Sequence, residues 1–213
     1  MAIFIVRHAE SEANINGRTL SHASIQLSEN GLNQAKNLIS KLPQIDKVII
    51  SKYLRTQQTA QPIIDHYNIP VEINDHLHEF SYLSEAKCAN TTLEERKVWV
   101  DEYWNKMDVQ YQDASDAESF AQFYGRVEKF AQKLKQLKTT YHDKNLLVVS
   151  HGQYIQLLMM YLNKEKTLSS DLMREFREEL KNNPIKNAAI YQFSLDSIET
   201  LGEFKLIDEK SNS

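Results

Sequence analysis

Three short runs of apolar residues, rich in Ile, Val and Leu, do not alternate with polar positions as half-exposed strands do. They occupy residues 3–6, 48–50 and 146–149. Continuous runs of this kind are typical of strands that are buried on both faces of a parallel sheet. The pattern therefore predicts that these three segments form the centre of a largely parallel sheet.

Segments with helical character separate the apolar runs. Ser28 is a suitable N-cap for a helix that runs to about residue 42, and residues 53–67 are rich in helix formers but contain Pro62, which can kink a helix. The order of strand, helix, strand and helix favours an α/β fold. We expect a three-layer sandwich in which helices flank a mostly parallel central sheet.

Between about residues 81 and 141 the chain shows helical patterns without a strand signal. Helices are predicted over residues 91–107 and 116–141, and Ser115 with Glu118 predicts a capping box before the second one. In that second helix, apolar residues recur at alternating spacings of three and four and form one stripe. The stripe consists of Phe120, Phe123, Val127, Phe130, Leu134, Leu137 and Tyr141. We interpret residues 81–141 as a helical cap insertion lying over the sheet.

The last third of the chain returns to alternating strands and helices. The remaining expected elements are strands at residues 145–150, 188–193 and 201–207 and helices at residues 152–162 and 169–180. The polar tail over residues 209–213 is expected to be disordered.

Length and composition narrow the classes of protein to consider. A chain of 213 residues of which 41% are apolar can bury one sizeable core, so we expect a single domain over residues 1–213. The formal net charge is −4 and the 25 basic residues are dispersed, which argues against a nucleic-acid partner. No stretch approaches the ~20 apolar residues of a membrane-spanning helix, so no membrane partner is expected. The oligomeric state cannot be inferred from the sequence.

The single cysteine and the N-terminus bear on cellular location. Cys88 has no second cysteine with which to form a disulfide or a thiolate metal cluster. The first residues form a short apolar run with neither a basic leader nor a small-residue cleavage site, so they are interpreted as a strand rather than a signal peptide. A reducing cytoplasm is the expected location.

Two of the predicted strands end in the same way, with a histidine directly after them. His8 follows the first strand and His151 follows the strand at residues 145–150, and ligands bind at this edge of open α/β sheets. Arg7 and Arg55 stand beside or near such strand ends, and guanidinium groups match phosphate oxygens in bidentate geometry. A helix beginning at Gly152 could direct free N–H groups at the same anion. The residues together predict a dianion pocket that contains imidazoles.

The motif around His8 and several later segments resemble those of a known protein family. Arg7, His8, Ala9, Glu10 and Ser11 resemble the Arg-His-Gly-Glu motif of the histidine phosphatase superfamily, which is phosphoglycerate mutase-like. Further segments resemble the family's motifs in the same order, at residues 27–35, 51–60, 77–79, 118–127, 149–152 and 187–190. The resemblance covers about residues 1–193 and is greatest to the small phosphatase branch. It implies that the helical cap lies over an active site.

The resemblance also implies a role for each site residue. His8 would be the nucleophile and would form a phosphohistidine, and Glu79 would be the general acid and base. The other expected catalytic residues are Arg7, Arg55 and His151. The expected phosphate-binding residues are Arg7, Asn14, Arg55, His151 and Gly152. No metal and no other cofactor is implied, because the arginines and histidines provide the charge that a metal ion supplies elsewhere.

The sequence also departs from the family in two places that bear on function. Ala9 stands where the family usually has glycine, which would be unfavourable if that position required a positive φ. Residues 80–85 lack both the glycine-containing segment common in the small phosphatases and the Arg-x-Tyr-Gly segment typical of the mutases, whose substrate carboxylate requires cationic groups. We therefore expect a phosphomonoesterase acting on a small-molecule phosphate ester, and a phosphoprotein substrate is left open. The alternatives are a phosphoglycerate mutase-type isomerase and a noncatalytic protein that binds phosphorylated ligands.

Some residues allow a structural and a functional interpretation. His76 and His78 could indicate a metal site on one strand face, but no further ligand cluster accompanies them. His22 could line the entrance to the pocket. Three aromatic residues of the insertion could either form a wall of the substrate site or pack the insertion onto the sheet, and packing is the preferred interpretation. This group consists of Trp99, Tyr103 and Trp104.

Overall fold

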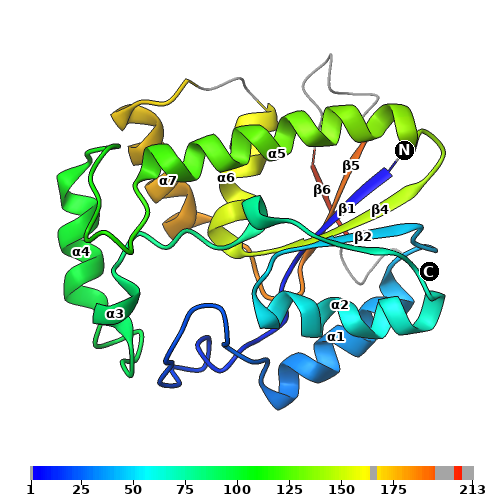
Figure 1. Ribbon diagram of the computed structural model, residues 1–213, viewed down its shortest axis with the longest axis horizontal. Coiled ribbons are helices and arrows are strands. Elements are labelled where there is room, and N and C mark those ends of the chain that lie inside the picture. Colours follow the sequence, from blue (N-terminus) through cyan, green and yellow to red (C-terminus); the bar gives the residue numbers. More distant parts are fainter. Residues whose placement is uncertain (1, 164–166, 195–203, 208–213) are drawn as a thin grey trace.

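A computed structural model of the protein describes residues 2–163, 167–194 and 204–207, and within them a six-stranded sheet forms the middle layer (Figure 1). The strands are β1 (Ala2–Arg7), β2 (Lys47–Ile50), β3 (Val71–Ile73), β4 (Asn145–Ser150), β5 (Ile190–Ser194) and β6 (Lys205–Leu206). Their order is β3-β2-β4-β1-β5-β6, in which the first four are parallel and β5 and β6 are antiparallel to their neighbours. The mostly parallel sheet that the sequence predicted is confirmed.

The register of the central strands places the ends of three strands at one edge. Arg7 of β1 lies opposite Ser150 of β4, and Ile50 of β2 lies opposite Val149 of β4. The residues that follow each strand, His8, Ser51 and His151, therefore leave the sheet at the same level. This is the edge at which ligands bind in open parallel sheets.

Helices cover both faces of the sheet, which makes the fold a three-layer sandwich (Figure 1). The helices are α1 (Glu29–Lys41), α2 (Leu54–Tyr67), α3 (Glu85–Cys88), α4 (Lys97–Lys106), α5 (Phe120–Thr140), α6 (Gly152–Asn163) and α7 (Ser170–Asn182), together with the 3₁₀ turn η1 (Asp75–Leu77). Within β1, Phe4 and Val6 contribute to the core beneath α1 and α2, whereas Ile3 and Ile5 contribute to the core beneath α5 and α6. Both faces of the strand are buried, and this explains the continuous apolar runs.

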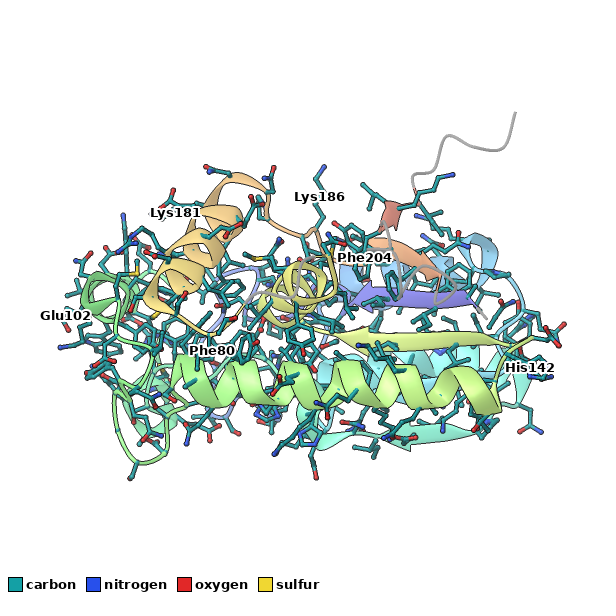
Figure 2. All side chains as sticks on the ribbon, turned by 90° about the horizontal axis from the view of Figure 1, so that it is seen from above. Phe80, Glu102, His142, Lys181, Lys186 and Phe204 are labelled. Atoms are coloured by element: carbon teal, nitrogen blue, oxygen red, sulfur yellow. The ribbon has the colours of Figure 1, made fainter. Side chains whose placement is uncertain are left out.

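The segment over residues 81–141 consists of two parts. Helices α3 and α4 lie beyond the sheet, on the side of the loop that follows β1 (Figure 1). Helix α5 lies along the sheet face, and Figure 2 shows Phe80 close to its N-terminal end. The apolar stripe of α5 is buried from Phe120 to Leu134, as predicted. The boundaries of the insertion and the single-domain organisation remain predictions.

Aromatic packing attaches the cap to the helical layer above the sheet. Phe80 stacks on Phe123 of α5 with ring centroids 4.3 Å apart, and Tyr103 and Trp104 of α4 pack around Phe80 with edge-on geometry. Tyr103 and Trp104 are buried, while Trp99 is partly buried beneath Lys87. The interpretation of this aromatic group as packing is confirmed, and it fixes the chain directly after Glu79.

Two details of the helix predictions were wrong. Helix α5 begins at Phe120, with Ser119 and Gln122 forming the capping box, because Glu118 is bonded instead to Arg126. The helix expected from residue 91 begins only at Lys97, since a turn over residues 93–96 precedes it. The short helix α3 was not predicted, whereas α1, α2, α6 and α7 agree with the prediction, and α2 continues through Pro62.

The strand predictions also differ in two places. The short edge strand β3 was missed because Val71 and Ile73 are exposed, so it has no buried apolar run. The last predicted strand is observed only as β6, and residues 201–203 and the tail at 209–213 lie outside the described residues. Within the described part of the chain, no helix is both long and apolar enough to cross a membrane.

Gly31 allows α1 to approach the loop that carries the nucleophile candidate, and this generates a prediction. A methyl group on Gly31 would overlap the backbone carbonyl oxygen of Glu10. Gly31→Ala should therefore lower the free energy of unfolding by about 1–3 kcal/mol. Urea denaturation measures the change.

The matched control is Gly125→Ala in α5, where no atom lies within 4 Å of the added methyl group. Alanine is the better helix former, so this variant should gain about 0.5–1 kcal/mol. Equal effects of the two substitutions would contradict the close approach of α1 to Glu10.

Candidate active site

A cavity of about 270 Å³ opens at the carboxyl ends of β1 and β4. Five of the residues singled out from the sequence line it: Arg7, His8, Asn14, Arg55 and Glu79. His151 lies behind this wall, completely buried, with its ring centroid 5.2 Å from that of His8. The structure thus brings together the two histidines, two arginines and the carboxylate that the sequence placed far apart.

The imidazole of His8 is fixed by its backbone surroundings. Its Nδ1 lies 2.7 Å from the carbonyl oxygen of Ala9, and its backbone N–H donates to the carbonyl of Ser150 over 2.8 Å. A carbonyl oxygen only accepts hydrogen bonds, so Nδ1 carries a proton, and in the neutral ring Nε2 then keeps a free lone pair. Burial, followed by the positive charges of Arg55 and Arg7, holds the pKa of His8 well below its usual value. His8 is therefore neutral at neutral pH, with an unprotonated Nε2.

His151 is held by a serine at the end of β2. Its Nε2 lies 2.9 Å from the Oγ of Ser51, while its Nδ1 is buried and has no hydrogen-bond partner among the described residues. Burial, and then the charge of Arg55, lowers the pKa of His151 well below the ordinary value. When the Ser51 hydroxyl donates to Nε2, the proton resides on Nδ1, which becomes a donor for an anion.

One nitrogen of the Arg7 guanidinium is bonded to the backbone, and another has no partner in the described structure. Its Nη1 donates to the backbone carbonyl of Ile185, whereas its Nε is buried without a partner in the described structure. Gly152 lies against this group, because a Cβ there would be 3.2 Å from Nε. An unpaired buried donor is unfavourable unless a ligand accepts from it, so Nε is suited to an anionic oxygen.

Arg55 is positioned by the loop after β1 and by an aromatic ring. Its Nη1 donates to the backbone carbonyl of His22 over 2.7 Å, and its guanidinium lies over the ring of Tyr53 at 4.8 Å. Burial lowers the pKa of Arg55 to about 10, which leaves it a cation at neutral pH. His22 lines the cavity, as its position near the phosphate loop suggested.

The carboxylate of Glu79 lies at the start of α6. It accepts hydrogen bonds from the backbone N–H groups of Phe80 at 3.0 Å, Tyr154 at 3.2 Å and Gln153 at 3.3 Å. Helix N-termini favour negative charge, so α6 holds this side chain in one orientation beside the cavity. The amides of Gln153 and Tyr154 are thus used by Glu79, and a phosphate contact from Gly152 remains a prediction.

Asn14 and Asn187 brace the loop that follows His8. The Oδ1 of Asn14 accepts from both the backbone N–H and the hydroxyl of Ser11, and from the side chain of Asn187 at 3.1 Å. Asn187 also donates to the carbonyl of His8 over 3.0 Å. Because the oxygen of Asn14 is used in this way, its amide N–H₂ is the group that remains for a phosphoryl oxygen.

The substitution of alanine for the family's usual glycine causes no backbone strain. Ala9 is not among the described residues with positive φ. Its N–H donates to Thr59 of α2 over 3.0 Å, and its methyl group is buried in a small cluster with Leu27 and Ala35. The position accommodates a side chain, so the concern raised by the sequence does not apply.

A second, more open cavity of about 620 Å³ adjoins the first and shares His22, Tyr53 and Ser81 with it. His78 lines this outer cavity, where burial lowers its pKa to about 4. Within the described residues, no group of three or more His, Cys, Asp and Glu side chains is arranged to hold a metal ion.

Sequence reasoning missed two features of the site. Ser51 was part of a recognised motif but received no role, although the position directly after a buried strand could have identified it. Arg96 also lines the cavity. It occurs in a run of charged residues that is indistinguishable from a solvated helix start, so no sequence signal identified it.

Comparison with known proteins agrees with this geometry. Residues 3–197 match the sequence model of the histidine phosphatase superfamily (branch 1), and the chain belongs to this superfamily. The chain is 32% identical over 165 residues to the adenosylcobalamin/alpha-ribazole phosphatase of Escherichia coli, a match covering 76% of this chain and 79% of that protein. It is 30% identical over 174 residues to phosphoserine phosphatase 1 of Hydrogenobacter thermophilus, covering 76% and 78% of the two chains. The chain is therefore a phosphatase.

Solved structures show the same fold. The alpha-ribazole phosphatase from Shigella flexneri matches with a TM-score of 0.75 at 23% identity, over 98% of this chain and 96% of the other. A mycobacterial glucosyl-3-phosphoglycerate phosphatase matches with a TM-score of 0.70 at 18% identity, over 96% and 97% of the two chains. At these identities the likeness supports the α/β sandwich alone.

The buried neutral state of His8 predicts how stability depends on pH. An unfolded histidine gains a proton near pH ~6.5, whereas His8 in the folded state does not, so the free energy of unfolding should fall as the pH decreases below this value. Each such histidine contributes up to about 1.4 kcal/mol per pH unit. Urea denaturation of the parent and of His8→Asn between about pH 7 and pH 5 should show a shallower slope in the variant. Parallel slopes would show that His8 takes up a proton in the folded state.

Proposed function

We propose that the protein is a metal-independent phosphomonoesterase that hydrolyses its substrate through a phosphohistidine on His8. The observation that carries this proposal is the contact between Nδ1 of His8 and the Ala9 carbonyl, because in the neutral ring it puts the proton on Nδ1 and leaves Nε2 with a free lone pair in a cavity lined by Arg7 and Arg55. A noncatalytic phosphate-binding protein would need the arginines but neither an oriented imidazole nor a carboxylate beside it.

The first half of the reaction transfers the phosphoryl group to the enzyme. Nε2 of His8 attacks phosphorus while the ester P–O bond breaks, and protonated Glu79 gives its proton to the departing oxygen. Arg7 and Arg55 bind the phosphoryl oxygens, and the unpartnered Nδ1 of His151 donates to one of them. These fixed charges stabilise the negative charge of the transition state, the role that a metal ion has in other phosphoryl transfer enzymes.

The second half of the reaction returns the enzyme to its starting state. Glu79, now a carboxylate, accepts a proton from a water molecule, and the oxygen of that water attacks phosphorus as the P–N bond breaks. Inorganic phosphate leaves, and His8 is again neutral. The hydrogen bonds to the start of α6, which hold the Glu79 carboxylate in one orientation, support its use in both halves of the reaction.

The substrate proposed for this site is a small-molecule phosphate ester. The cavity of about 270 Å³ is slightly smaller than the usual range of small-ligand pockets, roughly 300–1,000 Å³, which favours a small substrate. The names of the curated relatives also refer to small molecules, alpha-ribazole and phosphoserine. We further propose that the enzyme acts in the cytoplasm, where a single cysteine such as Cys88 remains reduced.

The first test of the mechanism is phosphate release from 4-nitrophenyl phosphate in excess chelator. The parent should remain active, and His8→Ala should lose at least about a thousandfold in kcat, because no nucleophile remains. Alkaline quenching of the parent should yield phosphohistidine on His8, detected by mass spectrometry. The control is His66→Ala, a histidine exposed on α2, which should retain parental activity. Activity that chelation abolishes, or that survives in His8→Ala, would overturn the proposal.

The second test concerns the role of Glu79 as an acid. Glu79→Gln should lose about 10²–10⁴ in kcat/KM toward alkyl phosphates, whose leaving groups need a proton, and much less toward 4-nitrophenyl phosphate. With the latter substrate the variant should also show a burst of nitrophenol, because phosphohistidine forms faster than it is hydrolysed. Glu118→Gln removes a carboxylate that lines only the outer cavity and serves as the control. Equal losses for both leaving groups would exclude Glu79 as the proton donor.

A further inference from the structure

Arg96 is a buried cation in the wall of the catalytic cavity that the mechanism above does not use. Arg96 is the N-cap residue of helix α4, which belongs to the helical segment over residues 81–141. Its side chain lines the same cavity as His8. Only 8% of its surface is exposed. Charged groups are rarely buried to this extent without a partner of opposite charge.

The hydrogen bonds of Arg96 all go to neutral oxygens. Its Nε donates to the hydroxyl of Thr91 over 2.7 Å, and its Nη2 donates to the hydroxyl of Thr19 over 2.8 Å and to the carbonyls of Cys88 and Thr91. No carboxylate of the described residues forms an ion pair with it. By contrast, Arg126 in α5 is paired with Glu118 through two bonds of 2.6 and 2.8 Å.

The arrangement leaves one nitrogen of Arg96 for a ligand. Because Nε and Nη2 are held by the loop after β1 and by the cap, the guanidinium is fixed in orientation, and Nη1 has no partner among the described residues. A guanidinium that is oriented before binding loses little conformational entropy when an anion binds. The carbon chain of such a ligand has apolar surfaces nearby, since Leu93 and Val100 line the cavity as well.

We propose that Arg96 binds a second anionic group of the substrate, a carboxylate or a second phosphate on the leaving group. The inference rests on the proposed phosphatase function and narrows its substrate class to small phosphorylated acids or bisphosphates. Arg7 and Arg55 bind the phosphoryl group that is transferred, and Arg96 binds the anion that remains on the alcohol product. Alkyl phosphates whose alcohol part carries no charge leave Arg96 without an anionic partner and are poorer substrates.

The test compares phosphate esters that differ only in the second charge. The probes are 2-phosphoglycolate, 3-phosphooxypropanoate and 4-phosphooxybutanoate, each paired with the monophosphate of the diol of equal chain length. The parent should prefer the carboxylate in at least one pair by about tenfold or more in kcat/KM, the effect of one hydrogen bond to a charged group. The bisphosphates of the same diols determine whether the favoured anion is a carboxylate or a phosphate.

Variants at the start of α4 then assign the preference to Arg96. In Arg96→Gln the ratio of carboxylate to diol substrate should fall to about one, whereas Arg96→Lys should keep part of it because the charge remains. Lys97→Gln removes an equal charge from the adjacent exposed residue and should keep the parental ratio. A ratio is unaffected by a general loss of active protein, so a purely structural role of Arg96 would leave it unchanged.

The outcomes separate this inference from the function on which it rests. If no probe and no aryl phosphate is hydrolysed, the proposed function fails. If the parent hydrolyses the diol monophosphates as well as the charged members, or if Arg96→Gln keeps the parental preference, the second anion site is overturned while the phosphatase function stands. The parental comparison alone decides the matter if Arg96→Gln does not fold.

Discussion

The hydrogen bond between Nδ1 of His8 and the carbonyl of Ala9 is the constraint to which the rest of the site is adapted. It places a proton of the imidazole on Nδ1, while burial and two adjacent guanidinium groups keep the ring neutral and so leave Nε2 unprotonated. The same cations that lower the pKa of His8 are the groups suited to bind the phosphoryl oxygens. In the mechanism we propose, activation of the nucleophile and recognition of the substrate therefore depend on the same two positive charges.

The backbone supplies most of this positioning. Strand register brings the residues after β1, β2 and β4 to one edge, and the start of α6 holds Glu79 through main-chain N–H groups. Main-chain donors cannot change rotamer, so the carboxylate is held in one orientation in the wall of the cavity. Such pre-organised dipoles are effective in catalysis because they need no reorganisation during the reaction.

The sequence was sufficient to predict the central sheet and to single out most of the charged and titratable groups that the fold gathers at the cavity. The runs in β1, β2 and β4 are continuous because both sheet faces are covered, and His8 and His151 follow two of these strands directly. Elements without a buried run were not predictable: β3 is a short edge strand with exposed Val71 and Ile73. The start of α5 was misplaced because Ser115 and Glu118 satisfy the capping pattern as well as Ser119 and Gln122 do. Arg96 was missed because only the tertiary fold distinguishes a buried arginine from a solvated one.

Thr19 lies in the loop between β1 and α1, and this loop is attached to both halves of the site. The carbonyl of His22 in the same loop holds Arg55, while Thr19 is bonded to Arg96 and, through its carbonyl, to the backbone of Asn90 in the cap. A cap sequence that moves residues 90–96 must therefore be accompanied by a compatible loop, or Arg55 shifts as well. Among homologues, substrate range should be inherited as a matched pair of segments, and an exchange of the cap alone between two enzymes should impair turnover together with selectivity.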